Sequence, residues 1–153
     1  GSGGIRCTDG TGTAASFKFR MDITNDGTNL YVTDSCGMIR KIVISSGVVT
    51  TLAGLDHNSH SEDGTGTAAS FDGIHGITSD GTNLYASETT SSKIRKIVIA
   101  SGEVTTIAGT GDAGCTDGTG TVASFYDPSG MTIEGTNLYI ADFYCNAIRK
   151  IEL

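Results

Sequence analysis

The stretch DGTGTAASF at residues 9–17 recurs, letter for letter, at residues 63–71, and it returns as DGTGTVASF at residues 117–125. Each copy begins 54 residues after the one before it. A fixed internal period of this size is typical of repeat proteins, in which one supersecondary unit is stacked on copies of itself. The repeat therefore predicts an array of three similar units rather than one domain around a single core.

A second phrase keeps the same period and marks two strands joined by a tight turn. In the middle repeat, GITS (76–79) meets the turn DGTN, and LYASE (84–88) follows. An Asp-Gly turn between two short apolar runs favours a β-hairpin. Two further runs, KIRKIVI (93–99) and VTTIA (104–108), flank the turn ASGE. Each repeat is thus predicted to hold four antiparallel strands. The three units span residues 1–54, 55–108 and 109–153.

The composition agrees with an all-β chain and narrows the choice of partners. Among 153 residues there are 22 Gly, one Pro and no Trp, and no segment carries apolar residues at helical spacing. The net charge is −7, and an acidic surface repels nucleic acid and anionic lipid. No apolar run is long enough to span a bilayer. We expect no nucleic acid partner, no membrane insertion and no cofactor.

Four antiparallel strands per unit, repeated with a long connector, describe the blades of a β-propeller. The phrases GIT, DGTNLY, IRKI, VTT and DGTGTAASF resemble the NHL-repeat family, in the long-connector form common in bacterial secreted proteins. The resemblance covers essentially the whole chain. The third repeat also carries the family's Pro-Ser-Gly at 128–130, whereas the first departs there with FRMD at 19–22. The resemblance implies three propeller blades.

The four cysteines occupy two matched positions. Cys7 and Cys115 each lie two residues before the DGTGT phrase, and Cys36 and Cys145 each lie three residues before the Ile of IRKI. The middle repeat has serine at both places. Because a direct bond would make two positions change together, we predict disulfides between Cys7 and Cys36 and between Cys115 and Cys145. Two disulfides indicate an extracellular location, at the cell surface or secreted, or else a periplasm.

The third repeat lacks its outer strand. It ends nine residues early, and the missing part corresponds to ASGEVTTIA (100–108). The preceding strand would be an unprotected edge, and three blades do not close a ring. A longer parent chain, a head-to-tail dimer of six blades and an open filament all remain as explanations. We therefore expect the partners to be other blades or copies of this chain. The expected assembly edge is formed by Ala147, Ile148, Arg149, Lys150, Ile151, Glu152 and Leu153.

The three histidines of the chain, all in the middle repeat, are weak candidates for a metal site. An HxxH pair with a third His could bind zinc. However, the neighbouring repeats have no His at the matching positions, and one blade cannot surround a propeller axis. We expect solvated loop histidines and no metal. The residues are His57, His60 and His75.

Two recurring charged groups have an architectural interpretation. The Asp-Gly phrases at Asp9, Asp63 and Asp117 resemble calcium loops only in composition, so we expect Asp to cap local N–H groups and Gly to take positive φ. A second group recurs once in every repeat, which favours an ion pair or a turn lock over a ligand-binding ring. Its acids are Asp34, Glu88 and Asp142, and its bases are Arg40, Arg95 and Arg149.

The sequence supplies no catalytic residues. No Ser-His-Asp order, nucleotide loop or haem-binding CxxCH motif occurs. The favoured hypothesis is an extracellular, non-catalytic NHL-like propeller module that acts as a scaffold, a binding module or a surface or filament assembly subunit. The alternative is a propeller enzyme of the lyase or hydrolase type with a site on the axis. Residues that occur in one repeat only and converge on that axis would distinguish the enzyme from the non-catalytic module.

Overall fold

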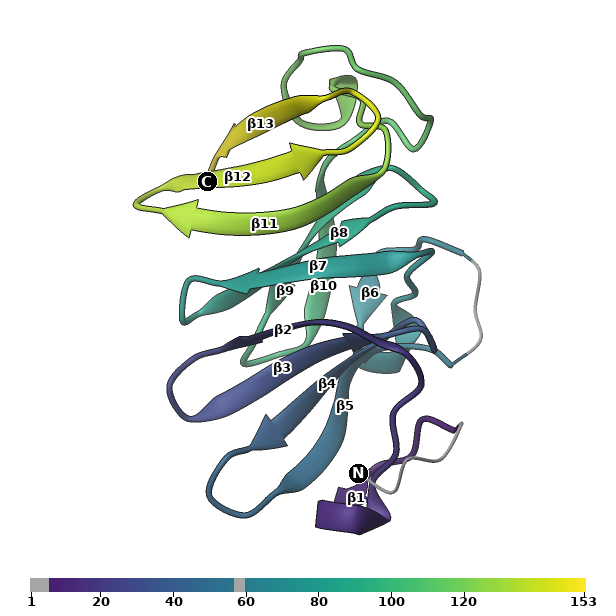
Figure 1. The fold of residues 1–153 in the computed structure, drawn as a ribbon, viewed down its shortest axis with the longest axis vertical. Helices are drawn as coiled ribbons and strands as arrows, with labels where there is room; N and C mark the ends of the chain where they lie inside the picture. Colours follow the sequence, from purple (N-terminus) through teal and green to yellow (C-terminus); the bar gives the residue numbers. More distant parts are fainter. Residues whose placement is uncertain (1–5, 57–59) are drawn as a thin grey trace.

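The chain folds into three antiparallel sheets stacked one on the next (Figure 1). The computed structural model describes residues 6–56 and 60–153. The strands of the first repeat are β1 (Gly10–Thr11), β2 (Arg20–Asn25), β3 (Asn29–Asp34), β4 (Met38–Val43) and β5 (Val48–Gly54). Those of the second are β6 (Gly64–Thr65), β7 (Ile74–Ser79), β8 (Asn83–Glu88), β9 (Lys93–Val98) and β10 (Glu103–Ala108). Those of the third are β11 (Pro128–Glu134), β12 (Asn137–Asp142) and β13 (Ala147–Glu152).

Helical structure in the described residues is limited to three single turns of 3₁₀ helix, one in each connector. They are η1 (Gly12–Ala14), η2 (Gly66–Ala68) and η3 (Gly120–Val122). No helix in this part of the chain is long and apolar enough to cross a membrane. The all-β fold expected from the sequence is therefore confirmed, and the last three residues of FRMD do enter a first strand, β2, despite the departure from the repeat pattern.

The first two sheets contain the four predicted strands and one that was not predicted. Their orders are β1-β5-β4-β3-β2 and β6-β10-β9-β8-β7. The additional strands, β1 and β6, come from the DGTGT phrase and pair with the outer strand of their own repeat, with Gly10 opposite Val49 and Gly64 opposite Val104. The connector thus protects the outer sheet edge, which would otherwise expose unpaired backbone groups.

The third sheet has only three strands, in the order β11-β12-β13. In the described residues its DGTGT phrase forms no strand, and no outer strand lies beside it in the way that β5 and β10 lie beside β1 and β6. β13 therefore ends the sheet (Figure 1).

The sheets pack face to face through two apolar clusters. The cluster between the first and second sheets includes Ile39, Phe71 and Leu84, and that between the second and third includes Ile94 and Phe125. The inner strands β2, β7 and β11 lie side by side (Figure 1). Burial on both faces of the middle sheet explains why apolar residues occur on both faces of its strands.

Side-chain to backbone hydrogen bonds also join the second strand of one sheet to the inner strand of the next. The Thr33 hydroxyl donates to the His75 carbonyl at 2.6 Å. The Ser87 hydroxyl, at the equivalent place, donates to the Ser129 carbonyl at 2.7 Å. The third repeat has Ala141 at this position, so it cannot make the same bond to a following sheet.

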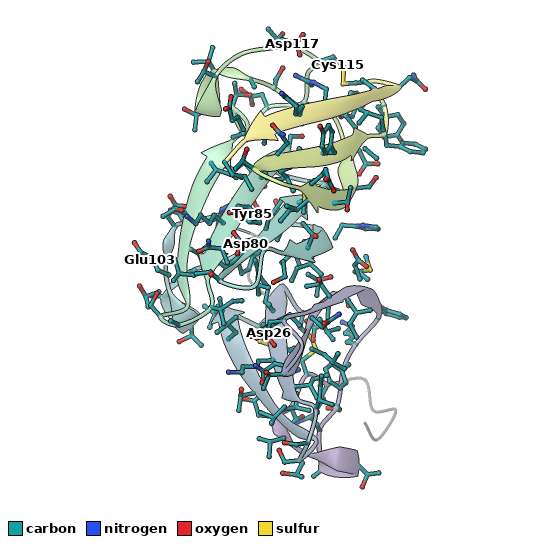
Figure 2. All side chains as sticks on the ribbon, turned by 90° about the vertical axis from the view of Figure 1, so that its left-hand side faces the viewer. Asp26, Asp80, Tyr85, Glu103, Cys115 and Asp117 are labelled. Atoms are coloured by element: carbon teal, nitrogen blue, oxygen red, sulfur yellow. A yellow bond between two sulfur atoms is a disulfide. The ribbon has the colours of Figure 1, made fainter. Side chains whose placement is uncertain are left out.

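The first hairpin turn of each of the first two repeats is closed by an aspartate. In the middle repeat, Asp80 accepts hydrogen bonds from the backbone N–H groups of Thr82 and Asn83, at 2.8 and 2.6 Å, and from the Tyr85 hydroxyl at 3.0 Å (Figure 2). Burial acts to raise the pKa of Asp80, but these bonds outweigh it and hold the pKa below the ordinary value. Burial and the Asp80 carboxylate raise the pKa of Tyr85 to about 12.

The Asp80 turn predicts that the protein loses stability at low pH. Because the pKa of Asp80 is lowered by folding, its stabilisation is present above the unfolded pKa of about 4 and is lost as pH falls through the folded pKa. Asp80→Asn should therefore reduce the loss of stability below pH 4, as measured by urea unfolding at several pH values. Asp112→Asn, in an exposed loop, is the control. An unchanged acid limb in Asp80→Asn would contradict the assignment.

Candidate functional site

An arginine organises each repeat, and it is fully buried in the first two. In the middle repeat the guanidinium of Arg95 donates to Glu88 at 3.1 Å and to Asp63 at 2.8 Å. It also donates to the Ser70 carbonyl at 3.2 Å and lies 5.2 Å from the ring centre of Phe71. We call this arrangement the arginine cluster. It joins the end of β8, the middle of β9 and both ends of the DGTGTAASF phrase.

The same cluster forms in the other two repeats. Arg40 contacts Asp34 at 3.4 Å and Asp9 at 2.6 Å, and Arg149 contacts Asp142 at 2.9 Å and Asp117 at 2.8 Å. Each arginine also lies over the phenylalanine that ends its phrase. The ion pairs inferred from the once-per-repeat acids and arginines are therefore present, and their repetition supports an architectural role.

The sequence interpretation of the Asp of DGTGT was wrong. It was assigned to local turn-making, yet Asp9 accepts from the Thr51 backbone N–H and hydroxyl, at 3.0 and 3.1 Å, as well as pairing with Arg40. Asp63 makes the equivalent contact with the Thr106 hydroxyl at 2.9 Å. The Asp therefore ties the connector to the outer strand across about 40 positions of sequence. The expectation of positive φ holds for the second glycine of the phrase, at Gly12, Gly66 and Gly120, but not for Gly64 and Gly118, which directly follow the Asp.

The pKa values of two of these acids, Asp34 and Asp63, shift in opposite directions. Burial raises the pKa of Asp34 above its ordinary value, although Arg40 acts in the opposite direction. For Asp63, burial also acts upwards, but the hydrogen bonds from Thr106 and the charge of Arg95 outweigh it and lower the pKa. Each acid is thus paired with an arginine of its own repeat, and these contacts join segments of the fold.

The structure joins Cys7 to Cys36 and Cys115 to Cys145, which is the pairing predicted from their joint replacement. Each bond ties a connector to the loop between the second and third strands of a repeat. No free cysteine occurs. The bonds close loops with sequence separations of 29 and 30 residues, so each restricts the unfolded chain considerably.

In the middle repeat, a carboxylate takes the place of the disulfide. The hydroxyls of Ser61 and Ser91 both donate to the Glu88 carboxylate, at 2.6 and 2.7 Å. The disulfide-bonded repeats have Asp34 and Asp142 where the middle repeat has Glu88. The longer glutamate side chain therefore occurs in the repeat that has the two serines. This third coupled position was visible in the sequence as the single Glu among the three acids, but sequence reasoning did not connect it with the cysteines.

The histidines predicted as weak metal candidates are not gathered into a site by the described structure. His57 lies outside the described residues. His60 lies in an exposed connector, and His75 lies on β7, where its Nδ1 is buried with no hydrogen-bond partner. The positions matching His75 are Met21 and Ser129, so this imidazole occurs in one repeat only.

Within residues 6–56 and 60–153, one group of three potential ligands has its donor atoms within 4.8 Å of one another. It consists of Cys7, Asp34 and Cys36. The two sulfur atoms are bonded to each other, and metal ligation by cysteine requires a thiolate. This group is therefore part of the disulfide and not a metal centre.

The expected assembly edge lines a groove of about 980 Å³ at the third sheet. One wall is β13, and the other is the connector around Asp117 and Gly118. The floor is formed by the second sheet, with Tyr85 and Ile107. In the first two repeats the corresponding space, between the third strand and the DGTGT phrase, holds β5 or β10. The groove thus corresponds to the place that the fourth strand occupies in the first two sheets.

The outward face of the third sheet is also uncovered. Ile39 and Ile94 are 0% exposed because the next sheet packs on them, whereas Ile148, at the same place in the third repeat, is 72% exposed. The third sheet therefore ends the stack with an edge and a face that are both covered in the other two repeats.

Comparison with protein-family models and with curated proteins finds no match. Among solved structures, a protein of unknown function from Bacteroides thetaiotaomicron is 29% identical, with a TM-score of 0.74 over 81% of this chain and 32% of that one. An auxiliary nutrient binding protein from the same organism is 20% identical, with a TM-score of 0.74 over 89% and 37%. A catalytically inactive virginiamycin B lyase from Staphylococcus aureus is 19% identical, with a TM-score of 0.57 over 92% and 43%.

These similarities show a propeller-like all-β fold. The chain spans less than half of the length of each of the three solved chains. The three solved proteins include a nutrient-binding protein and an enzyme. The fold alone therefore does not assign a function.

Proposed function

We propose that this chain is a portion of an extracellular, non-catalytic, NHL-like β-propeller that serves as a scaffold or binding module and joins further repeats at its third sheet. The observation that carries the proposal is the exposure of Ile148. The residues matching it are fully buried against a following sheet, and the third repeat keeps the same apolar residue on a face with nothing packed on it.

The occupant of this face is a further repeat of the same kind. The same surface receives such a repeat twice within the chain, at the two internal junctions. Burying an isoleucine side chain in a core contributes about 1.5–3 kcal/mol. An isoleucine that stays exposed on a sheet face does not gain this stabilisation. Because Ala141 replaces Thr33 and Ser87, the new junction lacks one inter-sheet hydrogen bond, and we expect it to be weaker than the internal junctions.

The charged groups support a non-catalytic role. The acid and arginine that recur in each repeat are bound to one another in the arginine cluster. General acid–base or nucleophilic catalysis requires a group within reach of a substrate, and these groups are occupied by structural contacts. The likeness to an auxiliary nutrient binding protein is in keeping with binding, and the two disulfides support an oxidising, extracellular setting.

The test is assembly in solution and its dependence on Ile148. We expect the chain to sediment faster than a 15.7 kDa monomer at tens of micromolar, and Ile148→Lys to shift it towards the monomer, because a charge on the packing face must lose its hydration. Leu55→Lys is the matched control, since Leu55 is also an exposed apolar residue but lies in the connector after β5. A single monomer peak for the unaltered chain, with native strand content by circular dichroism, would refute the proposal.

A further inference from the structure

Three exposed aromatic side chains gather at one end of the third sheet. Tyr126 comes from the connector before β11, and Phe143 and Tyr144 come from the turn between β12 and β13 (Figure 1). The ring centres of Tyr126 and Tyr144 are 4.7 Å apart, and those of Phe143 and Tyr144 are 5.0 Å apart. Although the rings are in contact, the three residues are, in chain order, 45%, 63% and 57% exposed. We call them the aromatic patch, and exposed apolar groups that lie together often mark a binding surface.

The aromatic patch is not part of the repeat pattern. The other two repeats have a charged or hydroxyl side chain at every matching position, and the turn of the first repeat is one residue shorter. These residues are Lys18 and Ser35 in the first repeat and Asp72, Thr89 and Thr90 in the second. Since all three repeats build the same three inner strands, the fold does not require aromatic rings at this place.

The positions that match the aromatic patch stay at the surface even where another sheet follows. Ser35 and Thr90 are exposed, although the second and third sheets pack on the two sheets that carry them. The stacking face is marked instead by Ile39 and Ile94, which are fully buried. The exposure of the aromatic patch therefore belongs to the loops at the end of the sheet and not to the stacking face.

The backbone holds the aromatic patch in one arrangement. The Tyr144 N–H donates to the Tyr126 carbonyl at 3.1 Å, and the Phe143 N–H donates to the Asp127 carbonyl at 3.3 Å. Cys145, which directly follows Tyr144, is tied to the connector by its disulfide. Because groups that are fixed before binding lose little conformational entropy when a ligand arrives, this arrangement favours affinity.

Three polar groups accompany the rings of the aromatic patch. Asp127 directly follows Tyr126 and has φ of +61°, where the middle repeat has Gly73. Few residues other than glycine tolerate this conformation, and Asp is one of them. Within the described residues, the Asp127 carboxylate and the hydroxyls of Tyr126 and Tyr144 form no hydrogen bond or ion pair. The aromatic patch therefore combines apolar ring faces with two hydroxyls and one charged acceptor.

We propose that the aromatic patch binds a neutral oligosaccharide. A pyranose ring has an apolar face of C–H groups that packs on an aromatic ring, and a rim of hydroxyls that both donate and accept hydrogen bonds. These hydroxyls can donate to the Asp127 carboxylate and accept from Tyr126 and Tyr144. A hydroxyl donated to a carboxylate is among the stronger hydrogen bonds in proteins. The inference goes beyond the proposed function, because it concerns a site away from the stacking face.

Other classes of ligand match fewer of these groups. An apolar partner would bury the carboxylate and the two hydroxyls without hydrogen bonds, which is costly. A cation enclosed by aromatic rings needs space between them, which rings in contact at 4.7 and 5.0 Å do not provide. Nucleic acid is repelled by the net charge of −7. A neutral sugar uses the ring faces and the polar groups together.

The experiment measures binding of cellohexaose, mannohexaose and maltohexaose to the full chain by isothermal titration calorimetry and saturation-transfer NMR. We expect saturable binding of at least one of them, with the strongest saturation at the C–H protons of its sugar rings, because these lie on the aromatic rings. Binding of none of the three would overturn the proposal. Saturable binding of choline without binding of any of the sugars would overturn it in favour of a cation site.

Tyr144→Ala tests the rings, because Tyr144 contacts both of the others. The sugar should bind this variant about tenfold more weakly, since one stacking face is lost and the other two rings lose their support. Phe19→Ala is the matched control. Phe19 is also an exposed aromatic residue, 73% exposed, but it precedes β2 in the first sheet, so its replacement should not change the affinity. Equal affinities of Tyr144→Ala and the unaltered chain would overturn the proposal.

Asp127→Asn tests the charged acceptor. Asparagine tolerates the same φ, so the variant keeps the backbone and the size of the side chain but loses the charge. We expect about fivefold weaker binding of the sugar, because a hydrogen bond to a charged group becomes one to a neutral group. Asp112→Asn, in the exposed loop of the same connector, is the control. An unchanged affinity in Asp127→Asn would overturn the assigned contact.

The saturation pattern on the unaltered chain covers the case in which Tyr144→Ala fails to fold, because it needs no substitution. Saturation spread evenly over the sugar, with no preference for its C–H face, would overturn the stacking. Ile148→Lys should leave sugar binding unchanged, and Tyr144→Ala should leave sedimentation unchanged. Assembly without sugar binding would refute only the sugar site, and sugar binding by a chain that stays monomeric would refute only the assembly.

Discussion

Replacing Arg95 with methionine is expected to lower the free energy of unfolding by about 3–5 kcal/mol, because the change leaves a buried carboxylate without its positive partner. Glu88 and Arg95 are both 0% exposed. Methionine fills a similar volume but supplies none of the donors that reach Glu88, Asp63 and the Ser70 carbonyl. The measurement is urea unfolding, with the change read from the midpoint at an unchanged slope.

The third repeat supplies a matched control for this substitution. Arg149→Met removes the same side chain from the same cluster and also leaves a buried acid, Asp142, but Arg149 is 10% exposed and its other partner, Asp117, is 95% exposed. Because water can replace part of the lost interaction, we expect a smaller loss. A second control pairs Arg95→Met with Glu88→Gln, which removes the uncompensated charge and should recover part of the stability. Equal losses for Arg95→Met and Arg149→Met would contradict the role of burial.

The second large effect concerns the disulfides. Replacing Cys115 and Cys145 together by serine is expected to cost about 2–5 kcal/mol, mainly because the unfolded chain is no longer cross-linked. Replacing Cys115 alone should be worse than the double change, because it leaves a free thiol at position 145 in an oxidising setting. Urea unfolding of the single and double variants measures both effects, and equal additive losses for the two single changes would count against a bond between them.

The middle repeat indicates how stability can be restored to the variant in which Cys115 and Cys145 are both serine. Adding Asp142→Glu to Cys115→Ser and Cys145→Ser reproduces the Ser61, Glu88 and Ser91 arrangement. We expect the triple variant to regain at least about 1 kcal/mol over the double one, because two hydroxyls can then donate to a charged acceptor. Asp142→Glu in the unaltered chain, where the disulfide fills that space, is the control and should not stabilise. A triple variant no more stable than the double one would refute this replacement.

Local features of the fold were readable from the sequence because they depend on neighbouring residues. Alternating apolar runs around Asp-Gly turns specify hairpins within a few residues, and Asp80 with its turn partners formed as the pattern indicates. The repeat made even one long-range contact readable, since joint replacement of two cysteines by serines in the middle repeat identified both disulfides.

The path of the connector was decided by tertiary structure alone. The Asp of DGTGT has the sequence of a turn former, yet Asp9 reaches Arg40 and Thr51, which lie far along the chain. Only the packed sheet brings them together, because a buried guanidinium needs carboxylates from more than one segment to offset its desolvation. For the same reason, only the folded structure shows the groove between β13 and the connector at Asp117. The sequence alone determined the hairpin strands β2 to β5, β7 to β10 and β11 to β13, their turns and the disulfide partners. The tertiary structure decided which buried charges meet and which surfaces stay open, because both depend on packing between segments that no local pattern relates.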